Sequence, residues 1–142
     1  MVRWNNCYSQ FVSVKSGIRQ GGILSPFLFN IYLDSIIVAL KQSDLGCHIG
    51  NVYTGCLAYA DDLILISASV IKLQKMLDIC TEYGTEIDMK FNPSKSCLFR
   101  IGKDVKEYIP NLQIDSHDVG WVDKLNYLGM YFNSGRTIRI DT

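Results

Sequence analysis

The chain has 142 residues and a mass of 16.1 kDa, which makes it one domain or a part of one. Hydrophobic residues make up 48% and charged residues 20%, so the composition is globular and excludes a disordered or low-complexity chain. Fourteen basic residues balance fourteen acidic residues, and this zero net charge excludes a polycation that holds nucleic acid by charge alone.

The amino-terminal part of the sequence predicts a strand, a loop and a long helix. Residues 8–14 are rich in β-forming side chains and predict a strand, and the glycines within residues 15–24 predict a loop. Ser25 is expected as the N-cap of a helix that has Pro26 at its first position and ends near residue 43. Apolar side chains lie nearly all round this helix, so we expect it to be buried and central.

The middle of the chain predicts a β-hairpin followed by a second helix. Two short apolar runs, residues 56–59 and 63–66, are separated by Asp61 and Asp62, which is typical of a hairpin with acidic residues at its tip. Residues 70–86 carry apolar side chains at steps of three and four and predict an amphipathic helix.

The carboxyl-terminal part predicts further strands at residues 96–101 and 125–132, while residues 103–124 are polar and give no clear signal. Helices are therefore mixed with mostly antiparallel strands. This mixture favours an α+β fold in two layers, an antiparallel sheet with helices packed on one face.

The cysteines and the apolar runs bear on the cellular compartment. Five cysteines without a C-x-x-C spacing, and the absence of a signal peptide, predict reduced thiols and an intracellular protein. No apolar run reaches the roughly 18–20 residues that a transmembrane helix needs, so we expect no membrane partner.

The adjacent carboxylates Asp61 and Asp62 are the first candidate site. Neighbouring side chains of a straight strand point to opposite faces, so a turn is what would let both carboxylates converge. Converging carboxylate oxygens suit Mg²⁺, which is bound by one or two carboxylates together with substrate phosphates, and such a site can run phosphoryl transfer. The pair alone leaves open an ordinary Asp-rich turn.

The glycine-rich segment before the first helix is the second candidate site. Glycines let the backbone approach a ligand closely, and the amino end of a helix favours phosphate. Arg19 adds a cation, and Gln20 offers both a donor and an acceptor. An ordinary glycine turn with a solvated Arg19 remains the alternative.

Together these two motifs resemble the reverse transcriptase family. The residues that carry the resemblance are Gly-Ile-Arg-Gln-Gly-Gly-Ile-Leu-Ser-Pro-Phe-Leu-Phe at 17–29 and Tyr-Ala-Asp-Asp at 59–62. Two further segments follow in the family's order, Asn-Pro-Ser-Lys at 92–95 and Tyr-Leu-Gly at 127–129. The resemblance covers residues 3–134.

The resemblance implies the palm part of a polymerase. We therefore expect a partial reverse transcriptase domain over residues 1–142, with the thumb-side strand pair beginning near residues 125–134. Ala60 stands where retroviral enzymes usually have Met or Val. Group II intron enzymes share this alanine but typically have proline where this chain has Arg19, so the sequence looks most like non-LTR (LINE-type) retrotransposons, with a group II intron-like enzyme as the alternative.

The resemblance also implies an activity and roles for particular residues. The activity is Mg²⁺-dependent nucleotidyl transfer from dNTPs to a DNA primer on an RNA template, with Mn²⁺ as a possible substitute ion. Asp61 and Asp62 are the implied catalytic metal ligands. The implied substrate-binding residues are Arg19, Gln20, Gly21, Tyr59 and Lys95, and the implied primer-contacting residues are Tyr127, Leu128 and Gly129. We therefore expect an intracellular protein of the nucleus and/or the cytoplasm.

The sequence departs from the family at one essential point. The family's palm has a third carboxylate on a strand before the glycine-rich loop, and no Asp or Glu precedes Gly17 here. We therefore expect the isolated chain to lack the first metal ligand, the fingers and the thumb, and to be inactive. A catalytically dead retroelement remnant and a nucleic-acid-binding module are the alternative functions.

Overall fold

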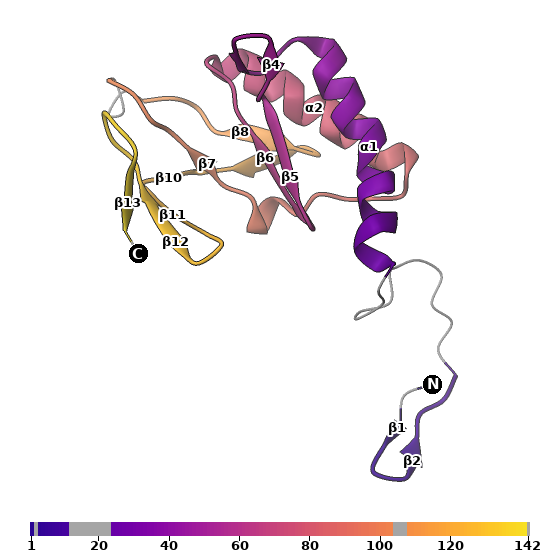
Figure 1. The fold of residues 1–142 in the computed structure, drawn as a ribbon. Helices are drawn as coiled ribbons and strands as arrows, with labels where there is room; N and C mark the ends of the chain where they lie inside the picture. Colours follow the sequence, from indigo (N-terminus) through magenta and orange to yellow (C-terminus); the bar gives the residue numbers. More distant parts are fainter. Residues whose placement is uncertain (2, 12–23, 104–107, 142) are drawn as a thin grey trace.

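The structure is a computed structural model that describes residues 1, 3–11, 24–103 and 108–141 (Figure 1). The loop predicted over residues 15–24 lies outside the described residues except for Leu24, and so do the predictions for Arg19, Gln20 and Gly21. In chain order the elements are β1 (Arg3–Trp4), β2 (Cys7–Tyr8), α1 (Ser25–Ser43), β3 (His48–Ile49), β4 (Val52–Tyr53), β5 (Cys56–Tyr59), β6 (Asp62–Leu65), α2 (Val70–Glu86), the 3-10 helix η1 (Pro93–Lys95), β7 (Leu98–Phe99), β8 (Leu112–Ile114), β9 (His117–Val119), β10 (Trp121–Val122), β11 (Lys124–Tyr127), β12 (Met130–Asn133) and β13 (Arg139–Asp141).

Both predicted helices form over the predicted residues. The expected N-cap of α1 is wrong by one position, because Leu24 is the N-cap and Ser25 is already helical. α1 ends at Asp44, which adopts a left-handed conformation with φ 54°. Ser69 caps α2, and its side chain accepts a hydrogen bond from the backbone N–H of Lys72.

The strands pair in small separate sheets. Five of the six sheets among the described residues are antiparallel, and one of these, β11-β12-β13, has three strands; β10 and β7 pair in parallel. Two helices with mostly antiparallel strands confirm the α+β class. The described strands form six sheets and not the one antiparallel sheet that the sequence suggested.

Three parts of the chain differ from what the sequence led us to expect of the strands. Of the strand expected over residues 8–14, Tyr8 is the last residue of β2, residues 9–11 are irregular, and residues 12–14 lie outside the described residues. The polar stretch 103–124 contains β8, β9 and β10. Residues 125–132 are not one strand but belong to the hairpin of β11 and β12, with Leu128 and Gly129 as its turn, in the region where the resemblance implied a strand pair.

Helix α2 lies between two apolar clusters. Met76 and Cys80 pack against the buried side of α1, and the two helices lie side by side (Figure 1). Leu73 and Leu77, on another side of α2, pack against the cluster formed by β7, β8 and β9. Cys80 is therefore a small apolar core residue, as the sequence predicted.

Helix α1 is not the buried central helix that its composition suggested. Leu33, Ile36 and Leu40 are buried, but Phe27 is 67% and Ile31 is 70% exposed. Composition shows how much of a helix is apolar, whereas the neighbouring elements decide which face is covered. In the described part of the chain, no helix is both long and apolar enough to cross a lipid bilayer.

Candidate active site

The predicted acidic hairpin forms from β5 and β6. Its register pairs Tyr59 with Asp62 and runs back to the pair of Cys56 with Leu65. Residues directly opposite each other in an antiparallel pair share a face. One face carries Cys56, Leu63 and Leu65, which pack against the core of α1 and α2. The other face carries Tyr59 and Asp62, which are both exposed.

Ala60 and Asp61 form the two-residue turn of this hairpin. Ala60 has φ 51°, a left-handed conformation that a two-residue hairpin turn requires at its first central position. Asp61 therefore occupies the turn itself, whereas Asp62 is the first residue of β6. Both carboxylates are exposed at the tip, and neither has a hydrogen-bond or ion-pair partner among the described residues.

The donor set at the tip fits one hard divalent cation. Two exposed carboxylates match the ligands that Mg²⁺ takes from a protein when substrate phosphates and water fill its other positions. They do not make a closed protein site. Nowhere in the described ranges do three or more His, Cys, Asp or Glu side chains form a group that could hold a metal ion.

Lys95 ends the short helix η1. Asn92 starts this helix by accepting a hydrogen bond from the backbone N–H of Ser94 at 3.0 Å, and Pro93 fixes its first turn. The Lys95 side chain is exposed, and η1 packs beside β9.

The Tyr-Leu-Gly motif is a β-turn with its flanking residue. Tyr127 ends β11 opposite Met130, and the turn residues Leu128 and Gly129 have φ 51° and 79°. Positive φ at both central residues defines a type I′ turn, whose twist suits a tight hairpin. Leu128 is 56% exposed at the tip of this hairpin.

One basic and aromatic surface was missed by the sequence reasoning. Lys124 and Tyr131 share one face of β11-β12-β13, with the Lys124 Nζ 4.3 Å from the centre of the Tyr131 ring. Arg139, on β13, lies on the same face because it is paired with Asn133, the partner of Lys124, and Asp141 lies there too because it is paired with Tyr131. The alternation of polar and apolar residues along 124–127 could have indicated a strand with one polar face that carries Lys124.

The comparisons with known proteins decide the family. The family described as "Reverse transcriptase (RNA-dependent DNA polymerase)" matches residues 1–132 of the chain. The chain belongs to the reverse transcriptase family. This match includes the Tyr-Ala-Asp-Asp hairpin and the Tyr-Leu-Gly turn.

The relatives of this reverse transcriptase chain are polyproteins of non-LTR retrotransposons, which confirms the predicted subtype. It is 31% identical over 138 residues to the Retrovirus-related Pol polyprotein from type-2 retrotransposable element R2DM of Drosophila melanogaster, covering 92% of this chain and 13% of that protein. It is 31% identical over 136 residues to the polyprotein from type-1 retrotransposable element R2 of Popillia japonica, covering 87% of this chain and 22% of that protein. It is 22% identical over 144 residues to the RNA-directed DNA polymerase from mobile element jockey of Drosophila funebris, covering 97% of this chain and 15% of that protein.

The chain thus spans about an eighth to a fifth of the length of these relatives. No solved structure matches the chain significantly. Reverse transcriptases in general use divalent metal ions, and the exposed carboxylates at the hairpin tip are compatible with that requirement.

Proposed function

We propose that this chain is the palm part of a non-LTR retrotransposon polymerase and that Asp61 and Asp62 hold the catalytic Mg²⁺. The observation that carries the proposal is the Tyr-Ala-Asp-Asp turn, which places two exposed carboxylates at the tip of a hairpin whose other face is packed on the core. The reaction is RNA-templated DNA synthesis, in which the primer 3′-hydroxyl bonds to the α-phosphorus of a dNTP and pyrophosphate leaves.

The carboxylates serve this chemistry because they are exposed and carry hard oxygen ligands. When bound there, Mg²⁺ neutralises phosphate charge and lowers the pKa of the attacking hydroxyl. Asp61, in the turn, is the principal ligand, and Asp62, on the outward face of β6, is the weaker or second ligand. Tyr59 shares that outward face with Asp62, and we assign it to packing near the primer end.

The other motif residues complete the proposed palm. Arg19, Gln20 and Gly21 would line the pocket of the incoming nucleotide, with Arg19 steadying the loop. Lys95 would assist the departing pyrophosphate through its positive charge. The β11–β12 hairpin, with Tyr127, Leu128 and Gly129, would be the thumb-side strand pair that orients the primer backbone.

The proposal extends to the arrangement and location of the domain. We propose that residues 1–142 belong to one two-layer polymerase palm, whose partners are an RNA template, a DNA primer and dNTPs. We place the protein inside the cell, in the nucleus and/or the cytoplasm. The five free cysteines support a reducing compartment.

Metal binding by the tip tests the proposal directly. Mn²⁺ is paramagnetic and can replace Mg²⁺, so it should broaden the backbone amide signals of residues 59–63 in the NMR spectrum. Asp61→Asn should weaken this binding about tenfold, because it removes one of two charged ligands. Asp34→Asn, which removes an exposed carboxylate from α1, is the matched control and should leave the broadening unchanged.

Primer extension tests the catalytic role. Any template-dependent incorporation in Mg²⁺ should fall at least about 100-fold in Asp61→Asn, since charge stabilisation by positioned groups supplies most of the catalysis. Incorporation that survives this substitution would contradict the assignment of Asp61 as a metal ligand.

Nucleic-acid binding without catalysis is a second candidate function. The face of β11-β12-β13 that carries Lys124, Tyr131 and Arg139 favours it, because cations beside an exposed aromatic ring suit a phosphate backbone and a stacked base. A gel shift with single-stranded RNA at two salt concentrations tests it. A shift that Lys124→Ala does not weaken would leave this face without the role.

A further inference from the structure

The position of the acidic tip depends on the base of its hairpin. β5 and β6 pair only with each other in the described chain, so no neighbouring strand holds them. Cys56 and Leu65 pack at the base and Leu63 packs next to Asp62, while Tyr59 and the two Asp residues are exposed. The packed face of the hairpin and its base therefore fix the tip together.

Backbone hydrogen bonds join this base to the segment that follows α1. Beyond the last strand pair, the N–H of Ile66 donates to the carbonyl of Gly55 at 2.8 Å. The N–H of Cys47 donates to the carbonyl of Ile66 at 3.1 Å, and the N–H of Thr54 donates to the carbonyl of Cys47 at 2.8 Å. Cys47 thus lies between the chain entering β5 and the chain leaving β6.

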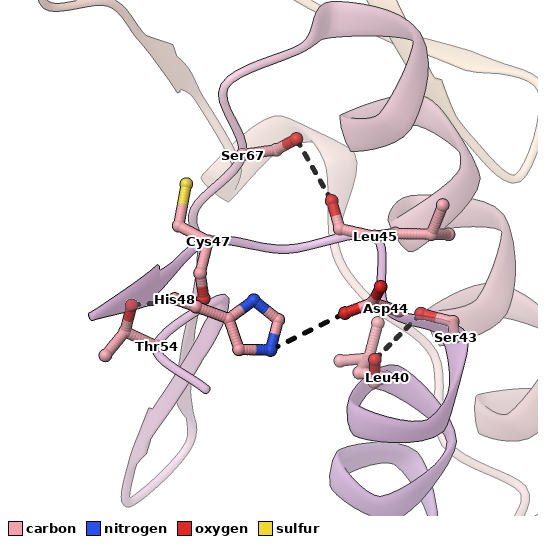
Figure 2. A network of polar contacts seen from close by, with 8 residues as sticks. All are labelled: Leu40, Ser43, Asp44, Leu45, Cys47, His48, Thr54 and Ser67. Atoms are coloured by element: carbon pink, nitrogen blue, oxygen red, sulfur yellow. Dashed lines mark hydrogen bonds and ion pairs between the residues drawn. The ribbon is translucent and has the colours of Figure 1, made fainter. Parts of the chain in front are cut away.

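Two hydroxyl groups reinforce the same junction, as Figure 2 shows. The Thr54 hydroxyl donates to the carbonyl of Cys47 at 3.1 Å. The Ser67 hydroxyl lies 3.3 Å from the carbonyl oxygen of Leu45, a contact between residues 22 positions apart in sequence. Both side chains are half-buried, which limits competition from water.

Ser67 also reaches the start of α2. Its hydroxyl accepts a hydrogen bond from the N–H of Ser69 at 3.3 Å and lies 3.1 Å from the Ser69 carbonyl oxygen. Ser69 is the N-cap of α2, and Leu45 follows Asp44, the residue that ends α1. One side chain therefore connects the exit of the hairpin to the ends of both helices.

The length of the hairpin amplifies any looseness at this junction. Ala60 is five residues from Gly55, which at about 3.3 Å per residue places the turn roughly 16 Å from the base. A rotation of about 4° at the base would then move the tip by about 1 Å, and misplacement of about 1 Å can cost about 100-fold in rate.

We propose that Ser67 and Thr54 are positioning residues for the metal-binding carboxylates, and this inference rests on the proposed function. Their hydroxyls fix the angle of the hairpin relative to α1. They touch neither substrate nor metal, so they act through Asp61 and Asp62. Removing them should leave the carboxylate pair intact and change only where it lies.

The test compares three variants of the 142-residue chain. Ser67→Ala combined with Thr54→Val removes both hydroxyls with little change in volume. Ser43→Ala is the matched control, because its hydroxyl is also half-buried but donates to the carbonyl of Leu40 within α1 at 2.7 Å (Figure 2). Ser67→Ala combined with Thr54→Ser restores the Thr54 hydroxyl and should recover part of the effect.

Three measurements separate positioning from unfolding. Residual dipolar couplings of backbone N–H groups report the orientation of β5–β6 relative to α1, and in the double variant those of the hairpin should shrink relative to those of α1. Mn²⁺ affinity at the tip should stay within about twofold, because the pair itself is unchanged. Any primer extension by the chain should fall about tenfold in kcat with little change in the dNTP KM, and where the wild type extends no primer, the couplings and the Mn²⁺ affinity decide the test.

Each outcome decides the proposal. The proposal is overturned if the residual dipolar couplings of the double variant still fit one common orientation for the hairpin and α1. It is also overturned if the couplings of the hairpin shrink while kcat stays unchanged. If the double variant loses both Mn²⁺ binding and the couplings of the hairpin, the hairpin has unfolded, and the proposal that the hydroxyls only position it is overturned. If the wild type binds no Mn²⁺ at the hairpin tip, the proposed function fails, and the couplings alone show whether the hydroxyls fix the hairpin.

Discussion

Gly46 and Gly55 meet backbone to backbone at the base of the acidic hairpin. A β-carbon placed on either residue would lie 2.5 Å from the Cα of the other, closer than real Cβ contacts come. The same β-carbon on Gly46 would lie 2.7 Å from the hydroxyl oxygen of Tyr53. The clashing atom is a backbone Cα in each case and cannot swing away as a flexible side chain could, so the contact permits only glycine at these two positions.

This contact predicts that Gly55→Ala destabilises the protein. The free energy of unfolding should fall by about 2–3 kcal/mol, because overpacking forces the backbone apart. Chemical denaturation monitored by circular dichroism measures the change. Gly120→Ala is the control, because a β-carbon there meets nothing within 4 Å, and its effect should stay within about 0.5 kcal/mol. Equal effects of the two substitutions would contradict the close approach.

Removing the hydroxyl of Tyr53 should have the opposite effect and stabilise the protein. It is buried and is the one side-chain polar atom of the described residues found buried without a hydrogen-bond partner. Burial, with smaller contributions from neighbouring thiols, raises the pKa of Tyr53. Tyr53→Phe should keep the edge contact with His48 and raise the free energy of unfolding by about 1 kcal/mol.

Tyr32→Phe is the control for this substitution. Tyr32 is 57% exposed on α1, so water satisfies its hydroxyl and its removal should change stability by less than about 0.5 kcal/mol. A loss of stability in Tyr53→Phe would show that the hydroxyl has a partner.

The sequence predicted the helices and the acidic tip because their signals are local. Apolar spacing set the bounds of α2, proline and serine set the start of α1 to within one residue, and two Asp residues between apolar runs set the turn of β5–β6. The roles of Asp61 and Asp62 as metal ligands stay predictions, since they depend on groups beyond the hairpin.

The sequence failed where structure depends on distant neighbours or on strain. The apolar residues of α1 do not reveal that Phe27 and Ile31 are exposed. Leucine rarely adopts positive φ, so Leu128 hid a turn that only Gly129 signalled. The base of the acidic hairpin was missed because Ser67 and Leu45 meet across 22 positions, which no local pattern encodes.

The strain at Leu128 can be tested by relieving it. Leu128 has φ 51°, and a left-handed conformation costs most residues about 1–2 kcal/mol. Asparagine tolerates this conformation and suits a type I′ turn before glycine. Leu128→Asn should therefore raise the free energy of unfolding by about 1 kcal/mol, measured by thermal denaturation. Leu128→Ala keeps the strain and serves as the control; if it stabilises equally, the gain does not come from the turn.

The buried thiol of Cys80 predicts a dependence of stability on alkaline pH. Burial, with a smaller contribution from Cys56, raises the pKa of the Cys80 thiol to about 12. In the unfolded chain the same thiol ionises near pH 8.5–9, so the folded state binds more protons between about pH 9 and 12. The stability that this thiol contributes is present below pH 9 and is lost as the pH rises through that window.

Cys80→Ala removes this titration and isolates its effect. The free energy of unfolding of the wild type should fall more steeply above pH 9 than that of Cys80→Ala, by up to about 1.4 kcal/mol per pH unit. Below pH 9 the variant should be less stable by a constant amount, because a small cavity replaces the sulfur. Urea denaturation at several pH values between 7 and 11 measures both. Parallel pH profiles would contradict the burial of Cys80 between the two helices, since an accessible thiol would ionise alike in the folded and unfolded states.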